Sequence, residues 1–174
     1  MRRGLLVVLA VIVLGFLAQR IFGDRTVEAR VMVPVPAATI AVAEADLAVT
    51  GGGVVVPWLP LAAEPGLPQL PTAAVPKGNR LAGPMLEQAR VLGAAPAALR
   101  PDLARSYYGE SGVDVETTAG IELRFGDASQ AARKWKAAAA VLADPAIEAL
   151  DYVDLHAPAR PAIGGSGHTL PPPP

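Results

Sequence analysis

Few side chains in this chain have the chemistry that catalysis or metal binding requires. Its 174 residues include two histidines, His156 and His168, and no cysteine, so thiolate chemistry and disulfide bonds are excluded. Three carboxylates, Asp127, Glu116 and Glu122, could pair as a general acid and a general base. Their spacing does not set the separation that such a pair needs, and isolated carboxylates are common on protein surfaces. The sequence therefore predicts a protein that is not an enzyme and has no metal or cofactor site.

Two glycine-rich segments could be functional sites, a phosphate-binding loop and a catalytic serine, but the sequence argues against both. Gly51-Gly52-Gly53 could cradle a phosphate, but no helix start, lysine or hydroxyl residue follows at the spacing of a P-loop. Ser166 could be a hydrolase nucleophile beside His168, but its flexible glycine-rich segment is unlike a strained nucleophile elbow. We interpret the first segment as a hairpin turn, since glycine tolerates positive φ. We interpret residues 164–174, which end in four prolines, as a disordered or polyproline tail.

The residues best suited to binding a partner lie in a predicted last strand. Apolar and polar residues alternate over 150–156, and this period of two would turn Val153 and Leu155 inward. The outward side chains would be Tyr152, Asp154 and His156. If the outer edge of this strand is unpaired, its main-chain groups can accept a strand from another protein. The alternative is that the segment from 158 to 167 covers this edge. The predicted partner-binding residues are Tyr152, Val153, Asp154, Leu155, His156 and Ala157.

The elements before this strand would hold it in place. Short apolar or alternating runs predict strands at 26–33, 39–44, 47–50, 54–56, 104–108, 113–117 and 121–125. The first two would form one hairpin and the next two another, followed by a proline-rich connector at 57–80. One helix is predicted from Pro84 to Gly93, and a second starts with Asp127 or Ser129 as its cap. The buried face of the second helix would contain Trp135, Ala138, Ala139 and Leu142. The predicted fold class is α+β, a mostly antiparallel β domain with two or three helices packed on the sheet.

The N-terminal segment predicts a membrane anchor. Residues 4–22 are apolar with two exceptions, and a membrane-spanning helix needs about 20 such residues. Arg2 and Arg3 precede the segment, so the positive-inside rule keeps residues 1–3 in the cytoplasm. A cleaved signal peptide has the same charged start and apolar middle, but no convincing cleavage site follows. We therefore expect a single N-terminal transmembrane helix with the remainder of the chain outside the cytoplasm.

The composition excludes one large class of function. The formal net charge is −1 and 18% of the residues are charged, whereas a nucleic-acid-binding domain shows a basic patch or stripe. Without the anchor and the tail, the chain is long enough for one domain with a modest core. We therefore expect protein partners rather than nucleic acid or a small-molecule substrate.

The order of these elements resembles the bacterial cell-division family FtsQ/DivIB. The most telling segment is 121–163, where the family typically shows a strand, a Leu-Gly-like turn, a lysine-bearing helix and a strand that ends in Asp-Leu-Arg. The matching residues are Phe125-Gly126-Asp127, Lys134 or Lys136, and Asp154-Leu155-His156 followed by Arg160-Pro161. Residues 26–48, with Glu44 in the last strand, resemble the end of the family's POTRA domain. Only residues 23–25 separate them from the apolar segment, so the resemblance implies a truncated POTRA region.

The resemblance implies a division scaffold rather than an enzyme. It predicts a single-pass plasma-membrane protein at the division septum, whose extracytoplasmic domain binds small coiled-coil divisome proteins of the FtsB/FtsL or DivIC type. This binding would help control septal peptidoglycan synthesis. The basic residues Arg133, Lys134 and Lys136 would either contact an acidic partner segment or form a solvated helix face. A membrane-anchored envelope interaction module unrelated to division is the alternative. The implied segments are a cytoplasmic tail (1–3), a transmembrane anchor (4–22), a POTRA-like remnant (23–48), an FtsQ-like β domain (49–163) and the disordered tail (164–174).

Overall fold

The structure, a computed structural model, describes residues 34–42, 45–59, 66–72 and 74–170 of the chain. These residues belong to one unit of the chain, which runs from Pro34 to Pro174. The predicted cytoplasmic tail, the predicted anchor at 4–22 and the predicted strand at 26–33 lie outside the described residues.

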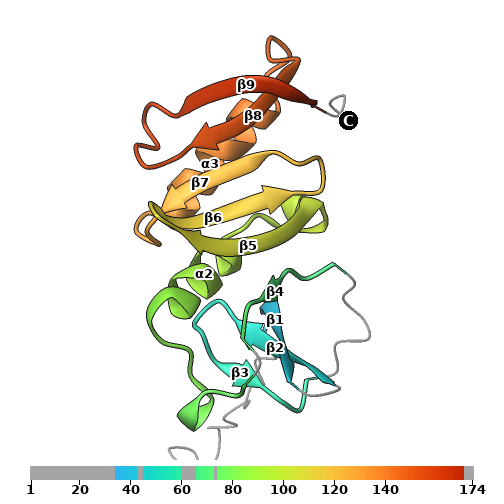
Figure 1. The fold of residues 1–174 in the computed structure, drawn as a ribbon, viewed down its shortest axis with the longest axis vertical. Coiled ribbons are helices and arrows are strands. Elements are labelled where there is room, and N and C mark those ends of the chain that lie inside the picture. The colour runs from blue at the N-terminus through green and yellow to red at the C-terminus, as the bar shows by residue number, and fades with distance from the viewer. Residues whose placement is uncertain (1–33, 43–44, 60–65, 73, 171–174) are drawn as a thin grey trace, which may run out of the picture. The chain divides into compact units, whose positions relative to one another are not determined.

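The first part of the described chain builds a small sheet (Figure 1). β2 and β3 form a predicted hairpin, and Gly53 in its turn has a φ of 73°. β1 pairs antiparallel with β2 and parallel with β4, which places Ile40 opposite both Leu47 and Leu70. β4 lies in the connector for which no strand was predicted, because two residues are too few to show a period. The strands are β1 (Pro36–Val42), β2 (Ala45–Thr50), β3 (Val55–Val56) and β4 (Gln69–Leu70), in the spatial order β3-β2-β1-β4.

The second sheet is larger and contains the predicted docking strand. Its members, in sequence and in spatial order, are β5 (Leu103–Gly109), β6 (Gly112–Thr117), β7 (Glu122–Gly126), β8 (Ala149–Asp154) and β9 (Ala162–Thr169). Neighbours are antiparallel except β7 and β8, which are parallel. The helix α3 (Ala131–Leu142) connects those two strands, and parallel neighbours need such a crossover. The predicted strands at 104–108, 113–117 and 121–125 are confirmed as β5, β6 and β7.

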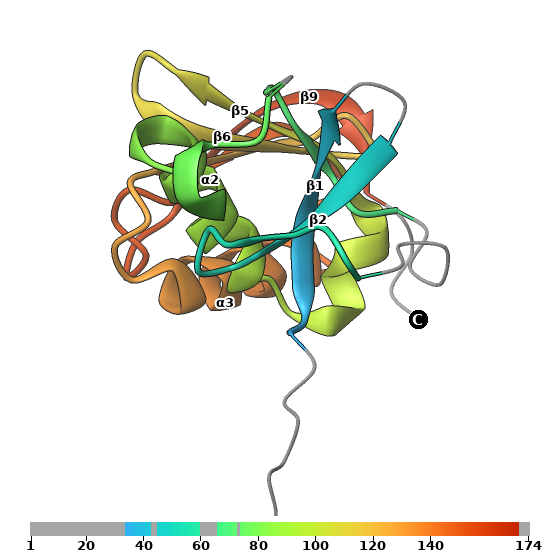
Figure 2. The ribbon, with the colours of Figure 1, turned by 90° about the horizontal axis from the view of Figure 1, so that it is seen from below.

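Two helices cover one face of the second sheet. The predicted helix from Pro84 is confirmed as α2 (Gly83–Gly93), which packs against β5 and β6 and also against β1. α3 packs against β7, and it lies on the same side of the sheet as α2 (Figure 2). Short 3₁₀ turns, η1 (Lys77–Asn79) and η2 (Ala97–Asp102), precede and follow α2.

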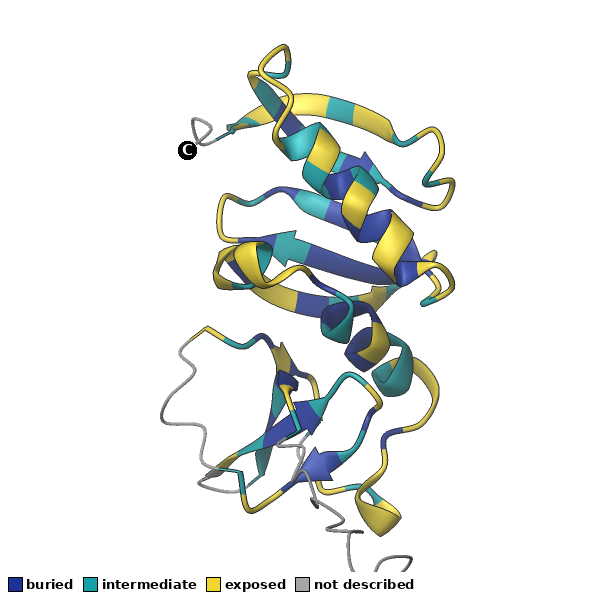
Figure 3. Cartoon of the chain, turned by 180° about the vertical axis from the view of Figure 1, so that it is seen from behind, coloured by how far each residue is buried: buried dark blue, intermediate teal, exposed yellow. Residues whose placement is uncertain are grey.

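One hydrophobic core includes residues of both sheets and of both α-helices, and its two largest side chains lie between α3 and the second sheet. Trp135 and Phe125 are fully buried, and their ring centroids lie 4.7 Å apart. Ala138 is buried on the same helix face, as predicted, whereas Ala139 and Leu142 are only half-buried. The outer face of α3 is exposed, and its buried residues face the strands (Figure 3). Close packing of the tryptophan and alanine side chains therefore fixes the helix on the sheet.

The fold-class prediction needs correction, because it did not include the parallel strand pairs. The fold is α+β and most neighbouring strands are antiparallel, but each sheet is mixed, because β4 lies parallel to β1 and β8 lies parallel to β7. The predicted transmembrane helix at 4–22 lies outside the described residues, and no helix in the part of the chain that the structure describes is long and apolar enough to cross a membrane. Alternating residues indicate a half-buried strand, but they do not indicate the direction of its neighbours. Two predicted segment boundaries fall inside strands. The boundary between residues 48 and 49 lies within β2, and the boundary between residues 163 and 164 lies within β9.

Candidate protein-docking site

The predicted docking strand, β8, lies inside its sheet. At Val153 the strand is paired with Leu123 of β7 on one side and with Ile163 of β9 on the other. Its main-chain groups therefore face paired strands on both flanks, and the prediction that β8 offers an unpaired outer edge was wrong. The alternative is confirmed: the segment that follows Pro158 covers this edge, and it does so as a strand (Figure 1).

β9 forms where a flexible tail was predicted, because its glycines make room for the side chains of β8. A Cβ on Gly164 would lie 2.6 Å from the Tyr152 hydroxyl, so the phenol ring lies across bare backbone. A Cβ on Gly165 or Gly167 would overlap the carboxylate of Asp151. That carboxylate instead accepts a 2.7 Å hydrogen bond from the Gly167 N–H. The prediction of a disordered tail beyond residue 163 was therefore wrong along the length of β9.

The six predicted docking side chains lie in different environments. Val153 and Leu155 are fully buried, which confirms their predicted inward orientation and prevents their side chains from meeting a partner. Tyr152 is half-buried, with the guanidinium carbon of Arg124 4.0 Å from its ring centroid, a distance typical of a cation–π contact. The remaining three lie at or just after the carboxyl end of β8 and are Asp154, His156 and Ala157. Any contact they make with a partner would therefore involve the end of β8 and not its length.

The exposed edge that was predicted for β8 is found at β9. Among the strands that the structure describes, β9 pairs only with β8, and its residues are exposed or half-buried throughout. Ile163 is 44% exposed. Residues 162–169 contain no lysine, carboxylate or proline, the residues that usually protect an edge strand from pairing. β5, at the opposite edge, contains Arg105 and packs against β4. β9 is therefore the better candidate for strand addition.

A basic groove of about 580 Å³ lies between α3 and the loop that joins β8 to β9. Arg133 and Lys136 line it from α3, where both are exposed. His156 and the next three residues line it from the loop, and none of the lining residues is acidic. Clefts lined by charges of one sign concentrate the opposite charge. The groove is therefore suited to an acidic segment of a partner.

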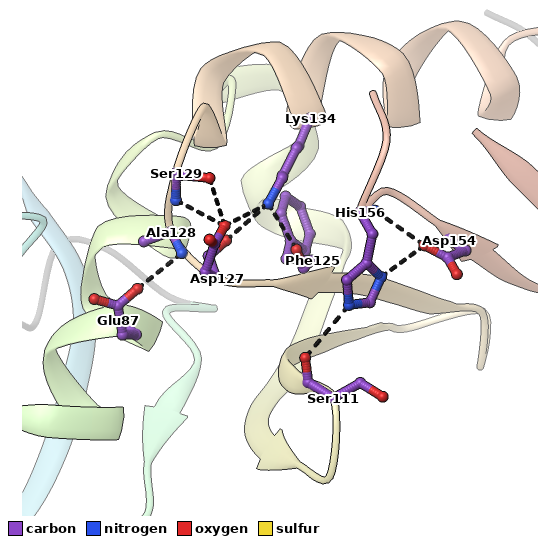
Figure 4. A network of polar contacts seen from close by, with 9 residues as sticks. All are labelled: Glu87, Ser111, Phe125, Asp127, Ala128, Ser129, Lys134, Asp154 and His156. Atoms are coloured by element: carbon purple, nitrogen blue, oxygen red, sulfur yellow. Dashed lines mark hydrogen bonds and ion pairs between the residues drawn. The ribbon is translucent and has the colours of Figure 1, made fainter. Parts of the chain in front are cut away.

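His156 is held at this groove by two hydrogen-bond acceptors (Figure 4). Its Nδ1 lies 2.7 Å from Asp154 Oδ1, and its Nε2 lies 3.3 Å from the Ser111 carbonyl oxygen. The ring lies against bare backbone, because a Cβ on Gly126 would be 2.5 Å from Nε2. The hydrogen bond to Asp154 raises the pKa of His156 above its ordinary value, and the Ser111 carbonyl adds to this effect. The surroundings therefore favour the charged imidazolium.

Lys134 was predicted either to contact a partner or to be solvated, and both predictions were wrong. The residue is 2% exposed, and its Nζ donates hydrogen bonds to the main-chain oxygens of Phe125 and Asp127 at 2.8 and 3.0 Å. A third bond, of 2.8 Å, reaches Asp127 Oδ1 (Figure 4). All three ammonium hydrogens are thus used. Lys134 therefore holds the turn from β7 to α3, because its long side chain brings a charged donor to the carbonyl groups of that turn.

Asp127 was predicted as a possible cap of the second helix, but the helix begins later. α3 starts at Ala131, preceded by Gln130 in the left-handed conformation with a φ of 51°. Asp127 Oδ1 instead accepts hydrogen bonds from the Ser129 N–H and hydroxyl at 3.1 and 2.6 Å. The hydrogen bond from Lys134, followed by that from the Ser129 hydroxyl, lowers the pKa of Asp127 to about 2. The carboxylate is therefore ionised throughout the neutral range.

The carboxylates considered as an acid–base pair are each bound to another partner. Glu116 accepts a 2.7 Å hydrogen bond from Arg105 across β5 and β6. Glu122 binds the Tyr107 hydroxyl and, at 2.7 Å, Arg124. The hydrogen bond from Tyr107 is the main cause that lowers the pKa of Glu122. Within the described ranges, no group of three or more histidine, aspartate or glutamate residues is placed to hold a metal ion.

No family model and no curated protein matches the chain. The function proposed below therefore depends on the geometry of β9 and the basic groove, together with the resemblance carried by residues 121–163.

Proposed function

We propose that this chain is a division scaffold of the FtsQ/DivIB type. It acts on the extracytoplasmic side of the plasma membrane at the division septum, where it binds small coiled-coil divisome proteins of the FtsB/FtsL or DivIC type. By holding them it helps control septal peptidoglycan synthesis. The resemblance over 121–163 supports this proposal, and the single structural observation that carries it is the exposed outer edge of β9, which contains no lysine, carboxylate or proline.

The proposed docking mode is strand addition at β9. A partner strand paired there extends the five-stranded sheet, and main-chain hydrogen bonds supply much of the affinity. Specificity comes from side chains next to the edge. Ile163, 44% exposed, offers an apolar contact beside the added strand. The predicted contacts of His156 and Ala157 stay in the proposal, because both residues line the basic groove near the start of β9.

The basic groove selects the partner by charge. Arg133 and Lys136 are exposed on one wall and His156 lies on the other. An acidic stretch next to the added strand would enter the groove and speed association, and salt would weaken this part of the contact. The proposal therefore needs a partner with an extended segment that adjoins acidic residues.

A lysine on the β9 edge tests the docking mode. Ile163→Lys places a charge beside the incoming strand, and the change costs little folding stability because the side chain is already 44% exposed. We expect at least about a tenfold loss of binding to the FtsB-, FtsL- or DivIC-type protein co-expressed from the same organism, since loss of one docked strand removes several hydrogen bonds. The assay is co-purification followed by titration of the purified proteins.

The matched control is Val75→Lys, because Val75 is 39% exposed and lies before η1 rather than in β9. This variant should bind the partner like the wild type. Equal binding by both variants would show that the partner does not use the β9 edge. Uniform distribution of a fluorescent fusion around the envelope, without enrichment at the septum, would contradict the division function and favour the envelope module.

A further inference from the structure

The His156 ring lies between two groups that can only accept hydrogen bonds. One is the Asp154 carboxylate, 2.7 Å from Nδ1, and the other is the Ser111 carbonyl oxygen, 3.3 Å from Nε2. A neutral imidazole has one N–H donor and one bare nitrogen, whereas the imidazolium has two donors. Only the charged ring can therefore make both bonds. In the neutral ring one nitrogen lone pair faces an oxygen, which is unfavourable.

The bond to Ser111 connects parts of the chain that are distant in sequence. Ser111 lies in the turn between β5 and β6, and His156 begins the loop between β8 and β9, 45 residues later. Residues 156–159 of that loop form one wall of the basic groove, and the loop leads directly into β9. Gly126, with a φ of 70°, leaves the space in which the ring lies. The ring thus joins the groove wall to the rest of the sheet.

We propose that His156 is a positioning residue that holds the β8–β9 loop closed only in its charged form, so that the docking surface loosens as the pH rises. The effect on docking rests on the proposed function of the β9 edge and the groove. The effect on the loop does not, because it follows from the two bonds alone.

The direction of the pH effect follows from the groups around the ring. Asp154 of β8 raises the pKa of His156, and burial together with the charge of Lys134 on α3 opposes it. Asp114 of β6 also interacts with the ring charge, and Arg124 of β7 acts on Asp154. The net effect is a pKa higher in the folded protein than in the unfolded chain. The bonds therefore stabilise the loop fully below the unfolded value of about 6.5 and are lost as the pH rises through the folded value.

Hydrogen exchange on the full chain tests the effect on the loop. We compare the amides of His156 and Arg160, which donate hydrogen bonds to Asp154 Oδ1 and to the Ala157 carbonyl oxygen, at acidic and mildly alkaline pH, after correction for the intrinsic pH dependence of exchange. In the wild type their protection should fall about tenfold at the higher pH, the size expected for one lost charge-assisted hydrogen bond. In His156→Arg the protection should stay constant, because the guanidinium stays charged.

Two further variants complete the test. His156→Gln should show low protection at both pH values, and His168→Asn, which changes the other histidine, should behave like the wild type. The same pH dependence in the wild type and in His156→Arg would overturn the proposal. So would an imidazole titration of His156, followed by NMR, with a midpoint at or below the ordinary histidine value.

Binding of the co-expressed divisome partner tests the consequence for docking. The wild type should lose affinity at the higher pH while His156→Arg does not. Wild-type affinity that does not change with pH, together with pH-dependent exchange, would overturn the docking part alone. Absence of binding by any variant at either pH would overturn the docking part together with the proposed function, while the exchange result would still decide the behaviour of the loop.

Discussion

Replacing Lys134 by methionine should lower the free energy of unfolding by about 3 kcal/mol. The ammonium donates to the carbonyl oxygens of Phe125 and Asp127 from a position that is 2% exposed. A buried polar group that loses its partner costs about 1–3 kcal/mol, and two such carbonyl groups lose this donor. Methionine is close to lysine in length and apolar, so the cavity contribution should stay below about 1.5 kcal/mol.

The ion pair with Asp127 should account for little of this loss. The Asp127 side chain is 67% exposed, and an ion pair with such exposure contributes at most about 1 kcal/mol. Because the pKa of Asp127 is lowered from 3.8 to about 2, its contribution is complete above the unfolded value and disappears as the pH falls through the folded value. Asp127→Asn should therefore cost less than about 1 kcal/mol, and this cost should vanish between about pH 4 and pH 2.

Urea unfolding of the full chain at pH 7, followed by tryptophan fluorescence, measures both effects. The control is Lys136→Met, two residues along the same helix and exposed, which should change stability by less than about 0.5 kcal/mol. A loss below about 1 kcal/mol for Lys134→Met would refute the argument that the carbonyl groups need this donor. Equal losses for Lys134→Met and Asp127→Asn would show that the carboxylate, and not the main chain, is the important partner.

Two other substitutions test the packing around α2. Gly93→Ala should destabilise the protein by about 2 kcal/mol, because a Cβ there would overlap the Cα of Gly51 and neither backbone can yield cheaply. Gly52→Ala meets only a threonine hydroxyl at 3.8 Å and should cost clearly less in the same urea assay. Trp135→Phe removes a 2.7 Å hydrogen bond to a main-chain carbonyl of α2 and should cost about 2 kcal/mol. Trp58→Phe, at a site 69% exposed, is its control, and equal melting temperatures for the two variants would contradict this assignment.

Much of the fold could be predicted because burial leaves a period in the sequence. The alternation around Val153 and Leu155 correctly predicted which side chains point into the core. The spacing of Trp135 and Ala138 likewise predicted the inner face of α3, and both residues are fully buried. These patterns arise within one element, where the chain geometry alone sets which side chains share a face. They could not show that β8 lies parallel to β7, since strand direction depends on the path of α3.

The candidate site could be predicted only in part, because its decisive residues depend on neighbours far away in sequence. Ile163 was missed, since the glycines that follow it hide the period of β9. The glycines of β9 lie opposite large side chains of β8, and this arrangement indicates a paired strand. It can be recognised only once the strand register is known. His156 was selected from its place at the end of the strand, whereas its contact with Ser111 could not be foreseen.

By itself, the sequence determined most of the strands, both α-helices and the apolar face that each of them turns inward, because these properties follow from local chain geometry and from the removal of apolar groups from water. The tertiary structure decided which strand edge is left exposed, that Lys134 is a buried donor rather than a surface charge, and that glycines after residue 163 build a strand instead of a tail. Hydrogen bonds between strands and the space beside a glycine both depend on groups that only folding brings together.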